Sequence, residues 1–391
     1  MGTKSEMSNN KEKSLTLQGN VKIWTNHSCM PKLKKESLKS LPSFEVVDLF
    51  CGIGGLSYGM KSSGFKILAG FDLDPTCKFA YETNTGGEFI YKDIKEVTDS
   101  DITSRYSFGA IKVLAGCAPC QPFSSYAFKH KEKDPNKYDL LYEFGRLVRE
   151  TGPDIVTMEN VPSIRTFSLK SVLSDFIFLL EEEDYKVWYD VVYCPDYGIP
   201  QTRKRLVLLA SKFGEIKIIP PTHNKDKFVT VRDAIGFLPP IAQGETSIKD
   251  PLHKCRSLSH LNIERLRHTT EGGSWKTWPK ELLLECHKKD SGKSFGSVYG
   301  RMEWDKPSPT MTTQCTGIGN GRFGHPEQDR AISAREAALL QTFPLDYKFF
   351  IDESAVSLTK ASRYIGNAVP PKLGEIVAKS IIKHVESLRG V

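Results

Sequence analysis

The sequence has no hydrophobic run long enough to cross a membrane. No stretch approaches the roughly 18 consecutive apolar residues that a membrane span requires. The opening MGTKSEMSNN has no apolar segment of the kind that secretion signals carry. Nine cysteines are an odd number in a chain with no export signal, which favours reduced thiols over a disulfide framework. We therefore expect a cytoplasmic protein that has no membrane partner.

Most of the chain also lacks a strong excess of either charge. The 54 Lys and Arg against 47 Asp and Glu give a net charge of +7. Residues 1–40 hold eight lysines and three glutamates, so the other 351 residues carry only +2. The overall charge therefore indicates no particular partner, and any nucleic-acid-binding face must be local. Residues 1–40, rich in Lys, Ser and Asn, predict a basic flexible extension.

No internal repeat is present, and 391 residues suggest about two or three domains. From residue 44 onward, short apolar segments alternate with segments of helical spacing. Strands are predicted at 44–50, 66–72, 111–116, 154–160, 187–194 and 205–211, and helices at 56–64, 140–150, 169–183, 333–341 and 374–388. This alternation predicts an α/β fold with a doubly wound, mostly parallel sheet. After residue 220 Pro, Gly, His and Thr accumulate, which predicts a smaller, irregular, β-rich second domain.

The turn after the first predicted strand lacks the phosphate-binding pattern G-x-G-x-x-G. The segment CGIGG (51–55) follows the first strand instead, a turn that either brings a ligand close to the backbone or is simply tight. Asp72 ends the second strand, where an acid can bind ribose hydroxyls, and Asp93-Ile94 can meet an adenine. Each acid alone also fits a surface turn. Together the three features favour a nucleoside-bearing cofactor, and the missing pattern favours S-adenosylmethionine over NAD.

Cys117 and Cys120 form a C-x-x-C pair in AGCAPCQPFSS (115–125). Such a pair can bind metal or carry out redox chemistry, but no second pair stands at zinc spacing, so we predict no metal. Prolines on both sides of Cys120 stiffen its backbone and fix the direction of the thiol, which favours a single nucleophile. Cys117 lies on the strand side and fits a buried structural cysteine better.

Two further motifs place charged groups at strand ends. Glu159 in MENV (158–161) follows another strand, where catalytic groups of open parallel sheets collect. It is a candidate acid beside a cysteine nucleophile, although a helix cap or a loop charge fits the same position. Arg203 and Arg205 in IPQTRKRLVLLAS (199–211) alternate at a strand entry. They predict either an anchor for a base or phosphate, or a solvated charged surface.

Together these residues resemble the C5-cytosine-specific DNA methyltransferase family, in its bacterial or phage modification form. The matching segments are DLFCGIGGLS (48–57), GCAPCQPFS (116–124), MENV (158–161), QTRKR (201–205), RAISAREAALLQTFP (330–344) and YIGNAVPP (364–371). They occur in the family's order and span about residues 45–385, so residues 1–40 lie outside the resemblance.

The resemblance implies a pocket for S-adenosylmethionine, with S-adenosylhomocysteine as product. Its residues would be Phe50, Gly52, Gly54, Gly55, Asp72, Asp93, Ile94, Leu140 and Asn367. Because Asn367 belongs to this pocket, a catalytic and cofactor-binding domain over 41–220 would be completed by 355–391. Residues 221–354 would then be the smaller target-recognition domain. Leu73 departs from members that place an aromatic side chain against the adenine.

The resemblance also implies the reaction. The Cys120 thiolate would add to C6 of cytosine, and C5 would then take the methyl group. Glu159 would bond N3 and the exocyclic amine, Arg205 would hold O2, and Arg203 would support the site and a phosphate. The base has to flip out of the duplex, at a cost of a few kcal/mol. The Lys-rich segment 123–139 would be a mobile loop that closes on the DNA.

The implied partner is double-stranded DNA, bound by a monomer in a restriction-modification context, with a possible restriction endonuclease that acts on the same site. The implied location is the cytoplasm of a bacterial or phage-infected cell. Basic and aromatic residues that would contact DNA are Arg256, Arg265, Arg267, Trp275, Lys276, Trp278 and Arg301. The glycine-rich segment 313–326 would let the backbone approach DNA closely.

Two alternatives remain at this point. A tRNA cytosine-5 methyltransferase would share the cofactor and the Cys/Glu pair, whereas a separate region of about 100 residues favours duplex recognition. A catalytically inactive DNA-binding protein would share the fold, whereas the presence of Cys120, Glu159, Arg203 and Arg205 favours an active enzyme.

Overall fold

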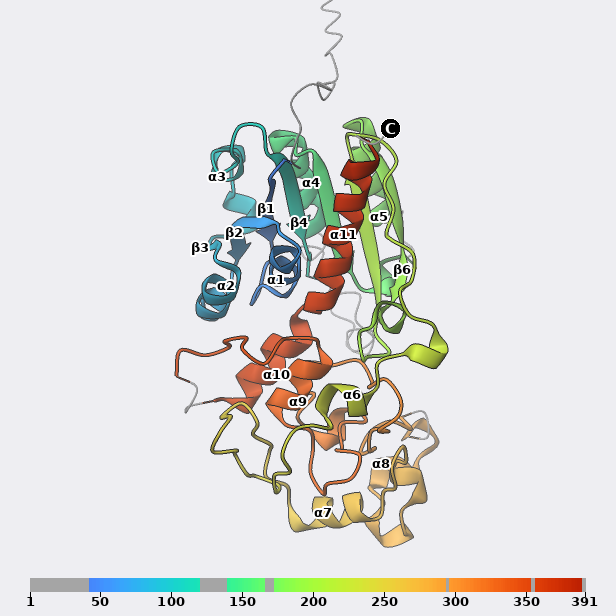
Figure 1. Ribbon diagram of the computed structural model, residues 1–391. Helices are drawn as coiled ribbons and strands as arrows, with labels where there is room; N and C mark the ends of the chain where they lie inside the picture. Colours follow the sequence, from blue (N-terminus) through green and yellow to red (C-terminus); the bar gives the residue numbers. More distant parts are fainter. Residues whose placement is uncertain (1–41, 120–138, 166–171, 293–294, 353–355, 389–391) are drawn as a thin grey trace, which may run out of the picture. The chain divides into compact units, whose positions relative to one another are not determined.

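A seven-stranded sheet runs through the first half of the described residues (Figure 1). The computed structural model describes residues 42–119, 139–165, 172–292, 295–352 and 356–388. The strands are β1 (Phe44–Leu49), β2 (Lys66–Asp72), β3 (Glu88–Tyr91), β4 (Ile111–Gly116), β5 (Ile155–Asn160), β6 (Lys186–Tyr193) and β7 (Lys204–Ser211). Their order is β3-β2-β1-β4-β5-β7-β6, parallel from β3 to β5, with β7 antiparallel to both of its neighbours. The predicted doubly wound, mostly parallel sheet is confirmed.

Helices cover both faces of the sheet. The described helices are α1 (Gly55–Ser62), α2 (Lys78–Thr85), α3 (Asp99–Thr103), α4 (Asp139–Thr151), α5 (Val172–Glu182), α6 (Val231–Ile235), α7 (His260–Arg267), α8 (Glu285–Lys288), α9 (Ala334–Leu340), α10 (Leu358–Asn367) and α11 (Pro371–Ser387). Val46 of β1 packs in one hydrophobic cluster with α1, α2 and α11. Val47 and Leu49 pack in another with α3, α4 and α5. Because helices cover both faces, every residue of β1 is buried, instead of every second one.

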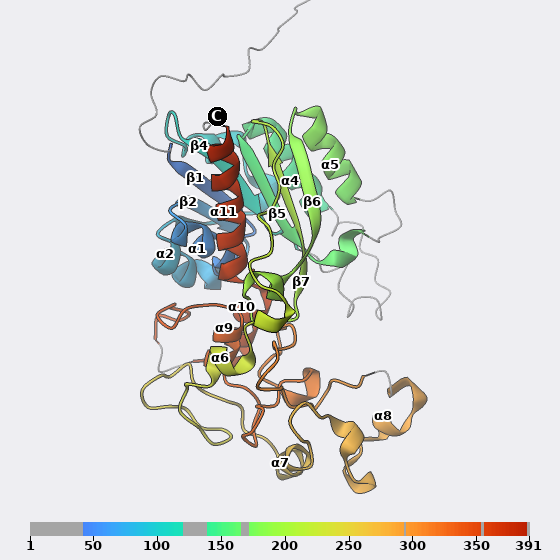
Figure 2. The same ribbon diagram turned by 45° about the vertical axis from the view of Figure 1, so that its right-hand side comes forward.

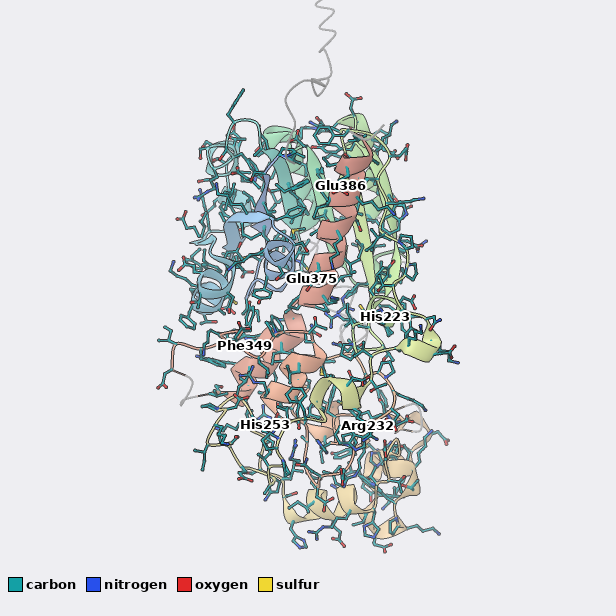
Figure 3. All side chains as sticks on the ribbon, in the orientation of Figure 1. His223, Arg232, His253, Phe349, Glu375 and Glu386 are labelled. Atoms are coloured by element: carbon teal, nitrogen blue, oxygen red, sulfur yellow. The ribbon has the colours of Figure 1, made fainter. Side chains whose placement is uncertain are left out.

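The last helix, α11, lies beside α1, one of the first elements of the fold (Figures 1 and 2). Pro371 opens α11, a position where the missing N–H costs nothing. A Cβ on Gly374 would stand only 2.6 Å from the carbonyl oxygen of Leu56, so glycine permits this close helix contact. Glu375 and Glu386, labelled in Figure 3, also belong to α11, and Glu375 pairs with Lys372 at 2.9 Å.

Residues 221–354 contain short helices and isolated bridges. Among the described residues of this range no strand is formed, so the predicted β-rich character is wrong. Side chains contribute to its main-chain hydrogen bonding: the Arg301 guanidinium donates to the carbonyls of Leu266, Thr269, His325 and Gln328. The domain boundaries at 220 and 354 stay predictions, and the extension 1–40 lies outside the described residues. No described helix is long and apolar enough to span a membrane.

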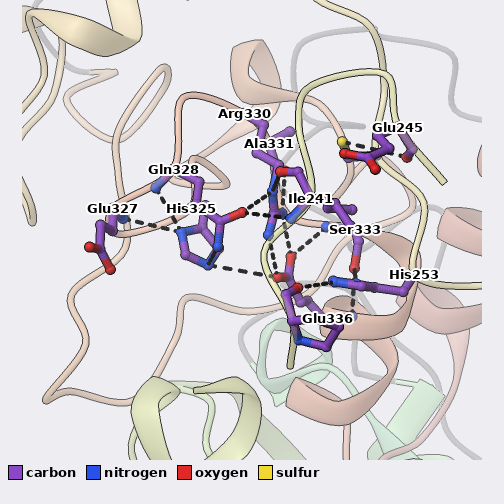
Figure 4. Close-up of polar contacts among 12 residues, drawn as sticks. Ile241, Glu245, His253, His325, Glu327, Gln328, Arg330, Ala331, Ser333 and Glu336 are labelled. Atoms are coloured by element: carbon purple, nitrogen blue, oxygen red, sulfur yellow. Dashed lines mark hydrogen bonds and ion pairs between the residues drawn. The ribbon is translucent and has the colours of Figure 1, made fainter. Parts of the chain in front are cut away.

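A buried ion pair joins the start of α9 to the segment that precedes it (Figure 4). Both carboxylate oxygens of Glu336 lie 2.7 Å from the guanidinium of Arg330, and each side chain is 1% exposed. In a capping box, the side chains of Ser333 and Glu336 each accept the main-chain N–H of the other residue. Burial lowers the pKa of His325 to about 4, so its ring is neutral, and its Nδ1 accepts N–H groups from Glu327 and Gln328. The carboxylate of Glu336 is therefore balanced chiefly by Arg330.

Candidate active site

Residues at the ends of five neighbouring strands form a row at one edge of the sheet. Phe50 follows β1, beside Asp72 at the end of β2 and Cys117 just after β4. Cys117 lies next to Glu159 near the end of β5, and Arg205 enters β7 on the other side. Parallel strands end at the same edge, and β7 begins there because it runs antiparallel. The register of the sheet thus brings together side chains that are up to 155 positions apart in the chain.

A cavity of about 1050 Å³ opens along this row. Predicted cofactor and catalytic residues that line it are Phe50, Gly52, Gly55, Asp72, Ile94, Leu140, Asn367, Glu159, Arg203 and Arg205. Gly54 and Asp93 do not line it. The predicted nucleophile, Cys120, lies outside the described residues, and so does the predicted mobile loop 123–139 except Asp139, which begins α4. No group of three His, Cys, Asp or Glu side chains that could hold a metal is found in the part of the chain that the structure describes.

The turn after β1 gives the cavity its floor. Phe50 has φ 59°, an uncommon conformation for a residue with a side chain and one that persists where the surroundings impose it. Gly54 has φ 90° and precedes α1; a Cβ there would meet Tyr81 at 2.9 Å, so this glycine serves helix packing. A Cβ on Gly55 would collide with the carbonyl oxygen of Val369. The turn therefore needs glycine to approach residues from the C-terminal part of the chain.

Asp72 is held in place by main-chain N–H groups. Gly52 and Asp74 each donate to its carboxylate at 2.8 Å. Burial nevertheless raises the pKa of Asp72, against the effect of these hydrogen bonds. Arg363 of α10 pairs with Asp74 at 2.9 Å, which ties the loop after β2 to the C-terminal part of the chain. The carboxylate is thus fixed at the cavity wall before any ligand enters.

The other predicted cofactor residues have unequal positions. Ile94 is buried and lines the cavity, whereas the side chain of Asp93 accepts the main-chain N–H of Lys95 at 3.0 Å and caps a short 3-10 helix. Asn367, the last residue of α10, lines the cavity while remaining exposed. Exposed Leu73 also lines it, at the position where the sequence departs from the family pattern.

Asp48 is a buried acid that the sequence reading did not select. It lies on β1 at 1% exposure and lines the cavity. The Ser57 hydroxyl donates to its Oδ2 at 2.5 Å, while its Oδ1 has no hydrogen-bond partner among the described residues. Burial raises the pKa of Asp48 to about 7, and the charge of Asp72 acts in the same direction. An orphaned buried oxygen in the cavity wall fits a site that receives a ligand with donor groups.

This pKa predicts how the protein's stability depends on pH. The folded state binds the Asp48 proton more tightly than the unfolded chain, so the contribution of Asp48 to stability falls as pH rises from about 4 to 7 and is constant above 7. Asp48→Asn removes this fall. When the pH is raised from 5 to 8, we expect the free energy of unfolding of the wild-type protein to fall by about 3 kcal/mol more than that of the variant. Urea unfolding at the two pH values measures this gain, and equal pH dependence of both proteins would contradict it.

Glu159 has two different neighbours for its two oxygens. Its Oε2 accepts the Cys117 thiol at 3.0 Å. Its Oε1 lies 2.7 Å from Nε of Arg205, an ion pair not aligned as a hydrogen bond. Glu159 is 5% exposed and the Arg205 side chain 13%, so the pair is poorly hydrated. The carboxylate is therefore held by one charge and one weak donor. The prediction that Cys117 is a buried structural cysteine is wrong, because it is half-buried and lines the cavity.

Arg203 plays a different part from Arg205. It is 2% exposed and donates to the carbonyls of Met311 and Ala368, at 3.2 and 3.3 Å. Burial lowers the pKa of Arg203 to about 9, helped by the nearby charge of Arg205. In this conformation Arg203 connects β7 to two distant segments of the cavity wall. A phosphate contact, one of the roles predicted for it, is disfavoured by this burial, although Nε has no hydrogen-bond partner among the described residues.

Several residues predicted to contact DNA are instead buried. Arg265, Trp275, Trp278 and Arg301 are 4–7% exposed. Arg265 donates to the Leu282 carbonyl at 3.0 Å, and its guanidinium lies 5.4 Å from the Trp278 ring. The prediction is wrong for these four, since they hold together residues 265–301. Arg256, Arg267 and Lys276 keep partial or full exposure, and for them DNA contact stays a prediction.

Some cavity residues were missed by the sequence reading. Thr310–Gln314 lines the cavity as a continuous segment, next to Gly366. It lies in an irregular region whose composition carries no period, so no local signal marks it. Gln314 and Asn320 belong to the glycine-rich segment 313–326, for which backbone approach to a ligand was predicted. Arg363 stands next to the YIGNAVPP motif, and this adjacency could have marked it.

Comparison with known proteins gives a consistent result. The model of the family described as "C-5 cytosine-specific DNA methylase" matches residues 44–383. The chain is 54% identical to the Type II methylase M.HgiDII of Herpetosiphon aurantiacus over 88% of this chain and 96% of that protein. It is 30% identical to the Type II methyltransferase M1.HphI of Haemophilus parahaemolyticus over 87% of each.

Solved structures share the fold. A crystal structure described as a prophage-encoded DNA modification methyltransferase of Escherichia coli superposes with a TM-score of 0.68, at 24% identity over 88% of this chain and all of that one. The methyltransferase EhMeth of Entamoeba histolytica superposes with a TM-score of 0.63, at 17% identity over 88% of this chain and 99% of that one. At these identities the superpositions establish the arrangement of the sheet and its helices.

Proposed function

The chain belongs to the C-5 cytosine-specific DNA methylase family, and from this premise we propose that it transfers a methyl group from S-adenosylmethionine to C5 of a flipped-out cytosine in a short specific duplex sequence. The observation that carries the proposal is the row formed by Asp72, Phe50, Cys117, Glu159 and Arg205 along one cavity. In this row Asp72, which would bind the nucleoside, lies at one end, and Glu159 and Arg205, which would bind the base, lie toward the other.

The cofactor half of the cavity fits S-adenosylmethionine, which supplies an electrophilic methyl group when bound. Asp72 would accept the ribose hydroxyls, because its carboxylate is already fixed by two N–H groups. The glycine turn leaves the backbone of Gly52 open, since a Cβ there would meet nothing within 4 Å. Ile94 would provide apolar contact with the adenine, and Leu140 and Asn367, which also line the cavity, would complete the pocket.

We expect Asp72→Ala to weaken cofactor binding about 10- to 100-fold, because two ribose hydroxyls lose a charged acceptor. Isothermal titration with S-adenosylhomocysteine measures this effect. The matched control is Asp226→Ala, on the exposed 3-10 helix Lys225–Lys227, which should leave the dissociation constant unchanged. Equal affinities of the Asp72 variant and wild type would exclude the ribose role.

The base would be held at the other half of the cavity. Arg205 reaches Glu159 and the cavity, so its guanidinium would bond O2 of cytosine while Glu159 bonds N3 and the exocyclic amine. Arg203 would act indirectly, because its bonds to the carbonyls of Met311 and Ala368 keep these two segments of the cavity wall in place. The role of Cys120 as the thiolate that adds to C6 rests on its motif, GCAPCQPFS (116–124).

The substrate we propose is double-stranded DNA, read by residues within 221–354 that form a target-recognition domain. The domain over 41–220 would be completed by 355–391, which agrees with the packing of α11 on α1. The Type II names of the relatives support a restriction-modification context, with a partner endonuclease that acts on the same sequence. We propose that the enzyme acts as a monomer and that residues 1–40 add non-specific attraction to DNA through their charge.

Bisulfite sequencing of DNA from cells that express the protein tests this function. We expect 5-methylcytosine at every copy of one short sequence, and none in cells that express Cys120→Ser. In parallel, purified protein is given duplex DNA or tRNA with radiolabelled S-adenosylmethionine. Transfer to tRNA alone would establish the tRNA alternative, and cofactor binding without transfer to either would establish an inactive DNA-binding protein.

A further inference from the structure

Among the described residues, the thiol of Cys117 is the hydrogen-bond donor to the Glu159 carboxylate. We propose that Cys117 is a positioning residue for methyl transfer, whose thiol orients Glu159 and gives way to the incoming cytosine. This inference rests on the proposed function, because it concerns the way in which Glu159 receives the base.

The geometry follows from the register of the sheet. Gly116 at the end of β4 is paired with Met158 of β5, so the next residues, Cys117 and Glu159, face each other across two adjacent strands. The Cys117 Sγ lies 3.0 Å from Oε2, while Oε1 faces Nε of Arg205 at 2.7 Å. The plane of the carboxylate is thus fixed from two sides. Removing either neighbour frees a rotation of the Glu159 side chain.

A thiol suits this position because it is a weak donor. A hydroxyl at the same place would bond a charged carboxylate strongly and compete with the exocyclic amine of cytosine for Oε2. Little binding energy is lost when the weak S–H bond breaks and the exocyclic amine of cytosine donates to Oε2 in its place. Cys117 can therefore orient the carboxylate in the free enzyme without delaying its contact with the base.

The alternative is that Cys117 fills space. Five other described cysteines, namely Cys51, Cys77, Cys194, Cys255 and Cys315, are buried in this manner. Cys117 differs from them because it is only half-buried and lines the cavity beside Glu159. Its bond partner is a carboxylate that the proposed reaction uses.

The test compares Cys117→Ala and Cys117→Ser by the single-turnover methylation rate of duplex DNA as a function of pH. Alanine frees the rotation of the Glu159 side chain, so we expect the rate at neutral pH to fall about tenfold because the carboxylate is less often oriented to receive the base. The serine hydroxyl is a stronger donor than the thiol. It therefore stabilises the charged form of the Glu159 carboxylate relative to the form that shares a proton with N3 of cytosine. The midpoint of the high-pH decline in rate should therefore move to lower pH in the serine variant and to higher pH in the alanine variant.

The controls separate this inference from its premise. Affinity for S-adenosylhomocysteine should stay within about twofold of wild type in both variants, which shows that they are folded. Cys286→Ser, at an exposed cysteine of α8, should match wild type throughout. Because Ala and Ser have similar volumes, a space-filling role predicts equal rates and unmoved midpoints, and that result would overturn the inference alone. A wild-type protein that transfers no methyl group to DNA would overturn the proposed function instead.

Discussion

Replacing Glu159 with glutamine is expected to lower the single-turnover rate of methyl transfer about 10³-fold, the loss typical of removing a group that stabilises charge in the transition state. Glutamine has nearly the same shape but carries no charge and cannot hold the proton shared with N3. Affinity for S-adenosylhomocysteine should be unchanged, because Glu159 and the proposed ribose acid, Asp72, lie on strands separated by β1 and β4. Rapid-quench measurement with radiolabelled cofactor gives the rate, and isothermal titration gives the affinity.

A matched control comes from α4. Glu143 also pairs with an arginine, Arg146, at 2.7 Å, but it does not line the cavity. Glu143→Gln should therefore retain the wild-type rate. If Glu159→Gln were as active as this control, the charge and proton at position 159 would not matter and the proposed role of Glu159 would be wrong.

The second large effect concerns stability. Arg330→Met should lower the free energy of unfolding by about 3–5 kcal/mol, because it leaves the carboxylate of Glu336 buried without its countercharge. Glu336 is 1% exposed, and both of its oxygens lie 2.7 Å from Arg330. Urea unfolding followed by tryptophan fluorescence measures the loss. Adding Glu336→Gln to this variant should recover part of it, since the stranded charge is then removed.

Arg232 provides the comparison at the surface. It also bonds both oxygens of one carboxylate, that of Asp305, at 2.7 and 3.2 Å, but both side chains are more than half exposed. Its position on α6 is labelled in Figure 3. Arg232→Met should therefore destabilise the protein far less than Arg330→Met does. Similar losses of stability in the two variants would mean that burial does not determine how much the Arg330–Glu336 pair contributes to the free energy of unfolding.

Much of the sheet could be predicted because its signals are local. The strands at 66–72 and 111–116 agree with β2 and β4 residue for residue, since each is an apolar run bounded by turn residues. The antiparallel direction of β7 could not be read in this way, because a strand's pattern of burial does not encode its direction. The four-residue β3 was missed because it is too short to show a period.

The candidate site shows the same division. Motifs at strand ends located Asp72, Glu159 and Arg205, since any parallel sheet brings such ends together. The bond between Cys117 and Glu159 depends on register, which no single segment specifies. Arg265 and Arg301 were misjudged for a related reason: a basic residue in an irregular segment has the same composition whether it faces solvent or donates to buried carbonyls.

The contact between the glycine turn and the C-terminal part of the chain has a consequence for biosynthesis. Gly55 packs on Val369, and α11 follows that residue. A ribosome that adds roughly 5–20 residues per second needs about 15–60 s to travel from the first of these positions to the second. During that interval the nascent chain carries an unfinished pocket and an uncovered apolar face on α1. A messenger RNA truncated before the codons of α11 should therefore yield a protein that does not bind the cofactor and is degraded by proteases. It should not yield a partly active fragment.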